Sequence, residues 1–177
     1  MHTVAKPVRV EGSLLEELYL AHASDAVRLA YLLTGDRALA EDLVQDAFVR
    51  VSGRLLHLRD PGAFPGYLRK AILNLVRSNA RRRAVERNYL EHTSALDRRT
   101  SRDPDVADRE AMRAALLELP VRQRAAIVLR FYEDMSETQI AEALRCRPGT
   151  VKSLISRGME RLRPLISDGD DERPAAS

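Results

Sequence analysis

The stretch from Met135 to Pro164 constrains the fold of this chain more than any other. Ser136 followed three residues later by Gln139 is the pattern of a capping box, in which each side chain satisfies a backbone N–H left unpaired at a helix start. Pro148 suits the first position of a second helix because its missing N–H would have no partner there. The pattern predicts a short helix, a tight turn and a second helix that closes near Pro164.

Apolar residues at helical spacing give both helices an inner face: Ile140, Ala143 and Leu144, then Val151, Leu154, Ile155 and Leu162. The outer face of the second helix would carry Lys152, Ser153, Ser156, Arg157 and Glu160. One interpretation is a helix-turn-helix, whose second helix enters the DNA major groove. The other is an ordinary helix pair in an all-α bundle with a solvated basic face. The spacing of the motif favours the helix-turn-helix interpretation.

Composition narrows the class of protein. The 177 residues suffice for one medium domain or two small ones, and 45% are hydrophobic and 31% charged. No run approaches the ~20 apolar residues that span a bilayer, and the N-terminus lacks the apolar core of a secretory signal. We therefore expect a cytoplasmic protein without membrane insertion. Cys146 is the single cysteine and the four histidines show no metal-ligand spacing, so we expect no disulfide, metal or other cofactor.

The net charge of +3 is unevenly distributed. A basic patch opposed only by Glu86 contains Arg69, Lys70, Arg77, Arg81, Arg82, Arg83 and Arg87. Such a patch suits the phosphate backbone of a nucleic acid. The alternative is a solvated helix end, where the helix dipole favours arginine. The density of the patch favours nucleic acid.

The order of the segments predicts an all-α fold of two small helical domains joined by a flexible linker. After a flexible N-terminus (1–12), Ser13 and Glu16 form a second capping box, and helical spacing continues to the turn at Gly35. A second helix runs from Asp36 to about residue 56 and a third from about Gly66 to residue 83. These form the first domain, 13–87. A linker (88–107), a domain with the helix-turn-helix (108–166) and a disordered tail (167–177) follow.

Taken in this order, the parts resemble a bacterial sigma factor of the extracytoplasmic-function (ECF) class, in its small two-domain form. Ala40–Val51 is similar to the helix of that family that binds core polymerase, and Tyr67–Arg83 to the helix that reads and melts the minus-ten element. Leu119–Ser136 and Pro148–Ser153 resemble the minus-thirty-five domain. The resemblance covers about residues 14–166.

The resemblance implies a promoter-specificity subunit and not an enzyme: it binds core RNA polymerase and promoter DNA, assists promoter opening, and has no catalytic residue and no small-molecule substrate. Many members also bind an anti-sigma factor. The residues that it implies for polymerase binding are Glu41, Asp42, Gln45 and Asp46. Those for the minus-ten element are Phe64, Tyr67, Asn74, Arg77, Arg81, Arg82 and Arg83. Those for the minus-thirty-five element are Arg147, Thr150, Lys152, Ser153, Ser156 and Arg157.

Within the minus-ten set, the implied roles differ. The arginines would hold phosphates, and the loop around Phe64 would receive a base that has left the stack. Asn74 would bond to a base edge, with a capping or surface role as the alternative.

The chain departs from the family pattern at four positions. The family usually has tryptophan where Tyr67 stands, an acidic residue at Ser78, glycine at Arg145 and often arginine at Leu154. Arg145 must therefore adopt the backbone angle that the turn requires. Arg147 is the candidate to replace a contact missing at position 154. Cys146 is interpreted as a small turn residue and not as a redox sensor.

Two other functions remain open from the residues. The first is a stand-alone helix-turn-helix repressor or activator, which would need a dimer interface or a ligand pocket. The second is a protein-interaction adaptor with incidental basic faces. No nucleophile–base pair or phosphate-cradling loop points to an enzyme.

Overall fold

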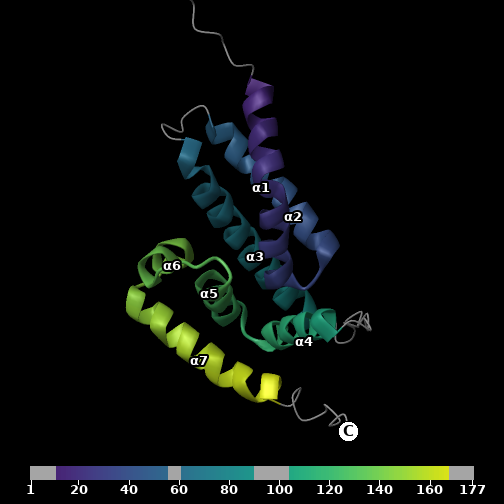
Figure 1. The fold of residues 1–177 in the computed structure, drawn as a ribbon, viewed down its shortest axis with the longest axis vertical. Helices are drawn as coiled ribbons and strands as arrows, with labels where there is room; N and C mark the ends of the chain where they lie inside the picture. The colour runs from purple at the N-terminus through teal and green to yellow at the C-terminus, as the bar shows by residue number, and fades with distance from the viewer. Residues whose placement is uncertain (1–10, 56–60, 90–103, 168–177) are drawn as a thin grey trace, which may run out of the picture.

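The computed structural model describes residues 11–55, 61–89 and 104–167, and within these ranges the chain is helical, without a strand (Figure 1). This confirms the all-α class. Most of the predicted N-terminal segment, the central part of the predicted linker (90–103) and nearly all of the predicted tail (168–177) lie outside the described residues.

The first unit consists of α1 (Glu11–Thr34), α2 (Arg37–Leu55), the 3-10 turn η1 (Pro61–Ala63) and α3 (Phe64–Tyr89). The three long helices pack side by side around a core that includes the fully buried Leu33, Val44, Phe64 and Ile72 (Figure 1). α1 is a single helix that begins at Glu11, so Ser13 lies within its first turn and is not its N-cap. α3 begins two residues before the expected Gly66 and continues past the expected end.

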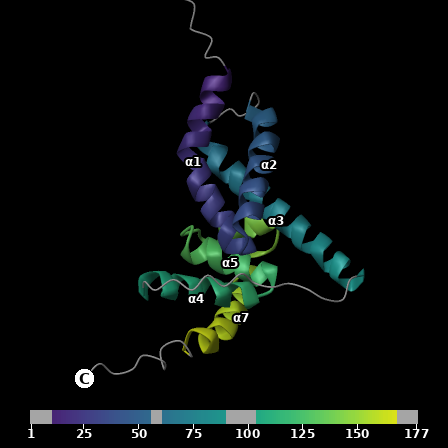
Figure 2. The same cartoon turned by 90° about the vertical axis from the view of Figure 1, so that its right-hand side faces the viewer.

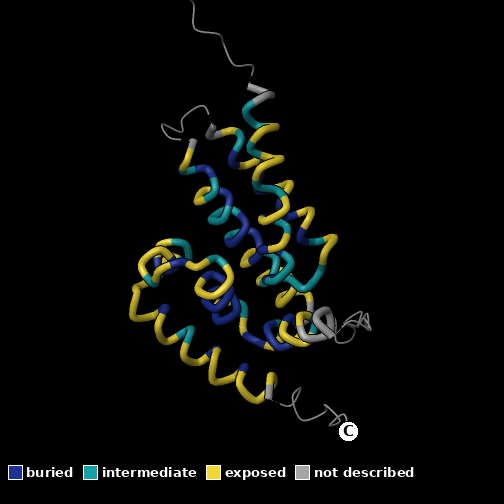
Figure 3. Tube along the Cα trace, viewed as in Figure 1, coloured by how far each residue is buried: buried dark blue, intermediate teal, exposed yellow. Residues whose placement is uncertain are grey.

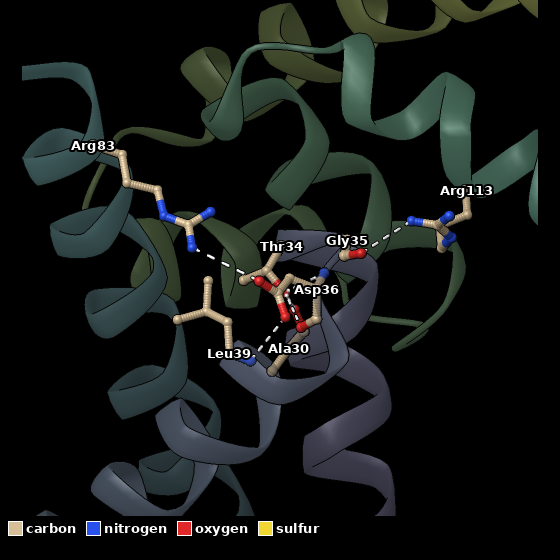
Figure 4. A network of polar contacts seen from close by, with 7 residues as sticks. All are labelled: Ala30, Thr34, Gly35, Asp36, Leu39, Arg83 and Arg113. Carbon is tan, nitrogen blue, oxygen red and sulfur yellow. Dashed lines mark hydrogen bonds and ion pairs between the residues drawn. The ribbon is translucent and has the colours of Figure 1, made fainter. Parts of the chain in front are cut away.

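The turn between α1 and α2 is closed by local hydrogen bonds (Figure 4). Gly35 has φ +73°, a backbone angle that costs glycine nothing, and its N–H donates to the carbonyl of Tyr31 at 2.8 Å. The carboxylate of Asp36 accepts from the N–H of Leu39 at 3.0 Å and caps the start of α2. The predicted turn at Gly35 is therefore confirmed.

The second unit consists of α4 (Pro104–Glu118), α5 (Val121–Phe131), α6 (Glu137–Leu144) and α7 (Pro148–Ser167). Residues 123–129 of α5 are all buried, so α5 is the central helix of this unit (Figure 3). The capping box is confirmed: Ser136 Oγ accepts from the N–H of Gln139 at 3.3 Å, and Gln139 Oε1 accepts from the N–H of Ser136 at 2.8 Å.

Two predicted helix ends are wrong. α7 passes through Pro164 and ends at Ser167, because a proline near the last turn removes only one backbone hydrogen bond of a helix that is otherwise packed. α4 begins at Pro104, a first-turn position that proline suits, so helix occupies the end of the predicted 88–107 linker.

The two units pack against each other. α4 and α5 contact α1, while α5 and α6 contact α3 (Figures 1 and 2). The helix-turn-helix unit is therefore docked on the first unit, and α7 packs on α4, α5 and α6 of its own unit.

Candidate polymerase and DNA interfaces

The acidic face of α2 is exposed. Its four predicted residues are all exposed: Glu41, Asp42, Gln45 and Asp46. The apolar residues on the opposite side of α2, such as Val44 and Ala47, are buried in the first unit. Glu41 forms an ion pair with Arg37 at 3.0 Å, one turn earlier. The structure thus brings the four predicted polymerase-binding residues together on one surface.

The four predicted minus-ten arginines of α3 lie on its C-terminal half, which extends beyond α1 and α2 in Figure 2. Arg77, Arg81, Arg82 and Arg83 are exposed. Arg83 lies 3.8 Å from the carboxylate of Asp36, a contact between two exposed groups that contributes little to stability. The arginines therefore form a cationic surface that a phosphate backbone can approach.

Two further predicted minus-ten residues lie on the N-terminal half of α3. Tyr67 is 48% exposed, so its ring is accessible. Asn74 is half-buried, at the junction with the second unit.

The structure corrects the prediction that Phe64 helps to receive an unstacked base. Its side chain is 0% exposed, and its ring centroid lies 5.7 Å from that of Phe48 and 5.8 Å from that of His22. A base cannot reach this ring, because the ring fills the core where α3 begins. The sequence did not reveal this, since Phe64 stood before the predicted helix start and belonged to no periodic pattern.

The outer face of α7 is exposed over its whole length (Figure 3). All the predicted minus-thirty-five residues are exposed: Arg147 in the turn before α7, and Thr150, Lys152, Ser153, Ser156 and Arg157 on the helix. On the opposite face, Val151 and Leu162 are buried, and Gly158 lies against Ile127 of α5. The structure therefore presents these hydroxyl and cationic groups on a helix whose inner face is fixed by packing.

The turn before α7 has the unusual geometry expected from its sequence. Arg145 adopts a left-handed conformation with φ 51° and ψ 57°, as a residue in place of glycine must. The N–H of Cys146 donates to the carbonyl of Ala141 at 2.9 Å and closes the end of α6. A left-handed arginine costs about 1–2 kcal/mol, which the packed helices on both sides offset. Leu154, another position where the chain departs from the family pattern, is half-buried.

Sequence analysis missed two buried arginines that join the units. Arg124 of α5 donates to the carbonyl of Leu33 in α1, and to the carbonyls of Leu117 at 2.9 Å and Leu119 at 3.0 Å. Burial lowers the pKa of Arg124 from its ordinary value. One signal was available: position 124 lies at helical spacing from the apolar Val121 and Val128, on the inner stripe of α5.

Arg113 of α4 is the second buried arginine. It donates to the carbonyl of Gly35 at 3.2 Å (Figure 4). It also lies 5.2 Å from the centroid of the Tyr31 ring and pairs with Glu110. The hydrogen bond to Glu110 raises the pKa of Arg113, and the same bond lowers the pKa of the Glu110 carboxyl. Each arginine thus places a cation at the carbonyl end of α1, where the helix dipole is negative.

Comparison with known proteins accounts for both units. Residues 18–85 match the family described as Sigma-70 region 2, and residues 109–162 match Sigma-70 region 4. The ECF RNA polymerase sigma factor SigL of Mycobacterium tuberculosis is 32% identical over 175 residues, which cover 95% of this chain and 97% of that protein. The chain belongs to the ECF class of sigma factors. Sigma factors are initiation factors that direct RNA polymerase to promoters, so the stand-alone repressor or activator is not favoured.

Other relatives agree with this assignment. The ECF RNA polymerase sigma factor SigE of Mycolicibacterium smegmatis is 35% identical over 170 residues, and the match spans 89% of this chain but only 63% of that longer relative. The RNA polymerase sigma-E factor of Streptomyces avermitilis is 35% identical over 163 residues, covering 90% of this chain and 89% of the relative.

Solved structures show the same fold. The sigma factor RpoE, in complex with the anti-sigma factor NepR from Bartonella quintana, superposes with a TM-score of 0.70 at 25% identity, covering 89% of this chain and 98% of that one. CnrH, in complex with the cytosolic domain of CnrY, shares the fold with a TM-score of 0.59 at 23% identity. In the described part of this ECF factor, no helix is both long enough and apolar enough to span a membrane.

Proposed function

We propose that this ECF factor binds core RNA polymerase through the acidic face of α2 and promoter DNA through α3 and α7. The observation that carries the proposal is the presence of three separate exposed surfaces, one acidic and two basic, on a chain whose two units match sigma regions 2 and 4. Carboxylates on α2 suit a basic partner through charge-assisted hydrogen bonds. The protein would act in the cytoplasm and leave bond formation to the polymerase.

The two basic surfaces would do different work. Lys152 and Arg157 project from the exposed face of α7, where a bidentate base contact is worth about 1–3 kcal/mol of discrimination. Arg81 and Arg82 crowd an exposed stretch near the end of α3, a position suited to phosphate contacts without sequence information. We therefore assign upstream sequence preference to α7 and support of strand opening to α3.

Run-off transcription on genomic fragments, with the chain added to core polymerase, tests the function itself. Specific transcripts that depend on the chain support it, and their absence with active core polymerase contradicts it. On a promoter found in this way, Arg157→Ala should relax the upstream sequence preference. The paired Arg81→Ala and Arg82→Ala variant should instead reduce strand opening and flatten the salt dependence by about one unit per lost phosphate contact.

Filter retention over a salt series measures binding, and permanganate reactivity of unpaired thymines measures opening. Arg109→Ala is a matched control, because it removes an exposed arginine of α4 outside the three surfaces. The assignment is reversed if Arg157→Ala abolishes opening but keeps the upstream preference while the double variant does the opposite.

We also propose an anti-sigma factor as a partner, since RpoE, which shares the fold, was solved in complex with the anti-sigma factor NepR. Affinity capture of the tagged chain from its native host, followed by transcription with the captured protein added back, tests this. A captured protein that suppresses the run-off signal supports the proposal, and capture of core polymerase subunits alone contradicts it.

A further inference from the structure

One contact between α5 and α7 leaves no room for a side chain. Gly158 is buried on the inner face of α7, against Ile127 of α5. A Cβ atom added to Gly158 would lie 2.5 Å from Ile127 Cδ1, 3.3 Å from Ile127 Cγ1 and 3.5 Å from Gln123 Cβ. Ordinary contacts between carbon atoms are about 3.5–4.0 Å long. The backbone of α7 therefore approaches α5 more closely here than any residue with a side chain would permit.

The α5 side of this contact is rigid. Ile127 is 5% exposed and Gln123 is 8% exposed, and both belong to the run 123–129 that is buried throughout. A β-branched side chain in a helix has one strongly preferred χ1 rotamer, and a packed interior leaves its end no free space to turn into. An added Cβ would therefore displace α7, by about 1 Å to restore an ordinary contact.

The displacement would tilt α7. Val151 is fully buried seven residues before Gly158, about 10 Å along the helix, so the start of α7 is anchored independently. Ser156 lies two residues before Gly158, about 200° around the helix, and so points in nearly the opposite direction, away from α5. A push at Gly158 would thus move Ser156 and the adjacent Arg157 outward, whereas Thr150 at the start of α7 would stay in place.

We propose that Gly158 is a positioning residue for sequence reading by α7. Gly158 lets the helix lie close enough to α5 for both ends of its DNA-facing surface to reach the same groove. This proposal rests on the assignment of α7 to the minus-thirty-five element. Hydrogen bonds to base edges have donor–acceptor distances of about 2.7–3.2 Å, and a shift of about 1 Å exceeds that range. A tilt about the start of α7 therefore breaks the contacts of one end and preserves those of the other.

Substitution of Gly158 gives a position-specific test. Filter retention by the chain with core polymerase is measured on a promoter found by run-off transcription and on versions with each upstream base pair changed in turn. Arg157→Ala and Thr150→Ala identify the base pairs that each end of α7 reads. Gly158→Ala should then relax the preference roughly tenfold at the base pairs that depend on Arg157, and keep it at those that depend on Thr150.

A compensating substitution identifies the contact. Ile127→Val removes Cδ1, the atom nearest to the added Cβ, and leaves a methyl group at the Cγ1 position, 3.3 Å away. The double variant Gly158→Ala with Ile127→Val should therefore recover the preference at the Arg157-dependent base pairs. Ile127→Val alone should retain that preference, since it removes volume without pushing α7. A folded double variant that still lacks the preference refutes the proposal.

Urea unfolding separates positioning from folding. Alanine is a better helix former than glycine, so Gly158→Ala favours the helix itself while the close contact opposes the change. Gly53→Ala in α2 is the matched control, because a Cβ there meets nothing within 4 Å, and it should leave every upstream preference unchanged. If Gly158→Ala does not fold, the folded double variant still decides by recovering or lacking the preference.

Three further outcomes contradict the reasoning in different ways. A folded Gly158→Ala variant with unchanged preference at the Arg157-dependent base pairs overturns the positioning role alone. Equal relaxation at both sets of base pairs also overturns it, because a tilt about Val151 spares Thr150. Absence of any chain-dependent transcript, or of any upstream base pair read by Arg157 or Thr150, instead refutes the proposed function of α7 on which the positioning role rests.

Discussion

Replacement of Arg124 is the sharpest test of how the structure is held together. Its guanidinium donates to three backbone carbonyls, two at the end of α4 and one in α1, and its side chain is buried. Arg124→Met preserves the length and much of the volume of the side chain but removes every donor. The three carbonyls would then lie in a site from which water is largely excluded.

The magnitude follows from these contacts. A hydrogen bond to a charged group contributes about 1.5–3 kcal/mol, so three bonds give a gross effect of roughly 5–9 kcal/mol. Burial of the guanidinium, which also lowers the pKa of Arg124, offsets part of this, as does the absence of a partner for its buried Nε. We expect a net loss of about 3–5 kcal/mol in the free energy of unfolding, because three carbonyls lose their donor and each unsatisfied buried acceptor costs about 1–3 kcal/mol. Arg124→Lys should lose nearly as much, since one ammonium cannot span the same acceptors.

Urea unfolding followed by circular dichroism measures the loss. Arg122→Met is the matched control, because it makes the same chemical change at an exposed position of the same helix, and it should alter the free energy by less than about 0.5 kcal/mol. A loss below about 1 kcal/mol for Arg124→Met would refute the reasoning, because the carbonyls would then be satisfied without the guanidinium.

Three further predictions concern individual residues. Gly35→Ala should destabilise the fold by about 2 kcal/mol or more in urea unfolding, because alanine would take a left-handed backbone angle and its Cβ would clash with Leu117 of α4; a loss below about 0.5 kcal/mol would show that neither effect operates. Since Arg113 lowers the pKa of Glu110 below its unfolded value, that carboxylate stabilises the fold above the unfolded pKa, and the contribution is lost as the pH falls through the folded value. Glu110→Gln should therefore reduce the slope of melting temperature against pH in the acid range, and an unaltered slope would show that the pair is not linked to folding. Asp46→Arg should weaken capture of core polymerase with unchanged helicity, and equal capture by this variant would remove α2 as the contact.

Many structural features of this ECF factor could be predicted from its sequence, because they depend on residues that are close together in the chain. The capping box at Ser136 and the inner stripe of α7 depend on residues close together in the chain, so residue type and spacing specify them. The special backbone angle of Arg145 was expected from the resemblance, because the family usually has glycine at that position. The exposed faces of α2 and α7 could also be predicted. Their acidic and minus-thirty-five residues are exposed because the opposite sides of the two helices are apolar. Family resemblance then supplied roles for these residues.

Contacts between distant segments decided the rest. Sequence analysis placed Phe64 in a base-receiving loop, whereas the packing of α1, α2 and α3 places it in the core. Arg124 was not singled out from the sequence, and its acceptor on Leu33 lies 91 positions earlier in the chain. The docking of α5 and α6 on α3 depends on an ion pair between residues 64 positions apart, which no periodicity encodes. Helical spacing determines which side of a helix is apolar, whereas the partner of that side is determined by long-range packing, and so the partial burial of Asn74 between the two units is a property of the tertiary structure alone.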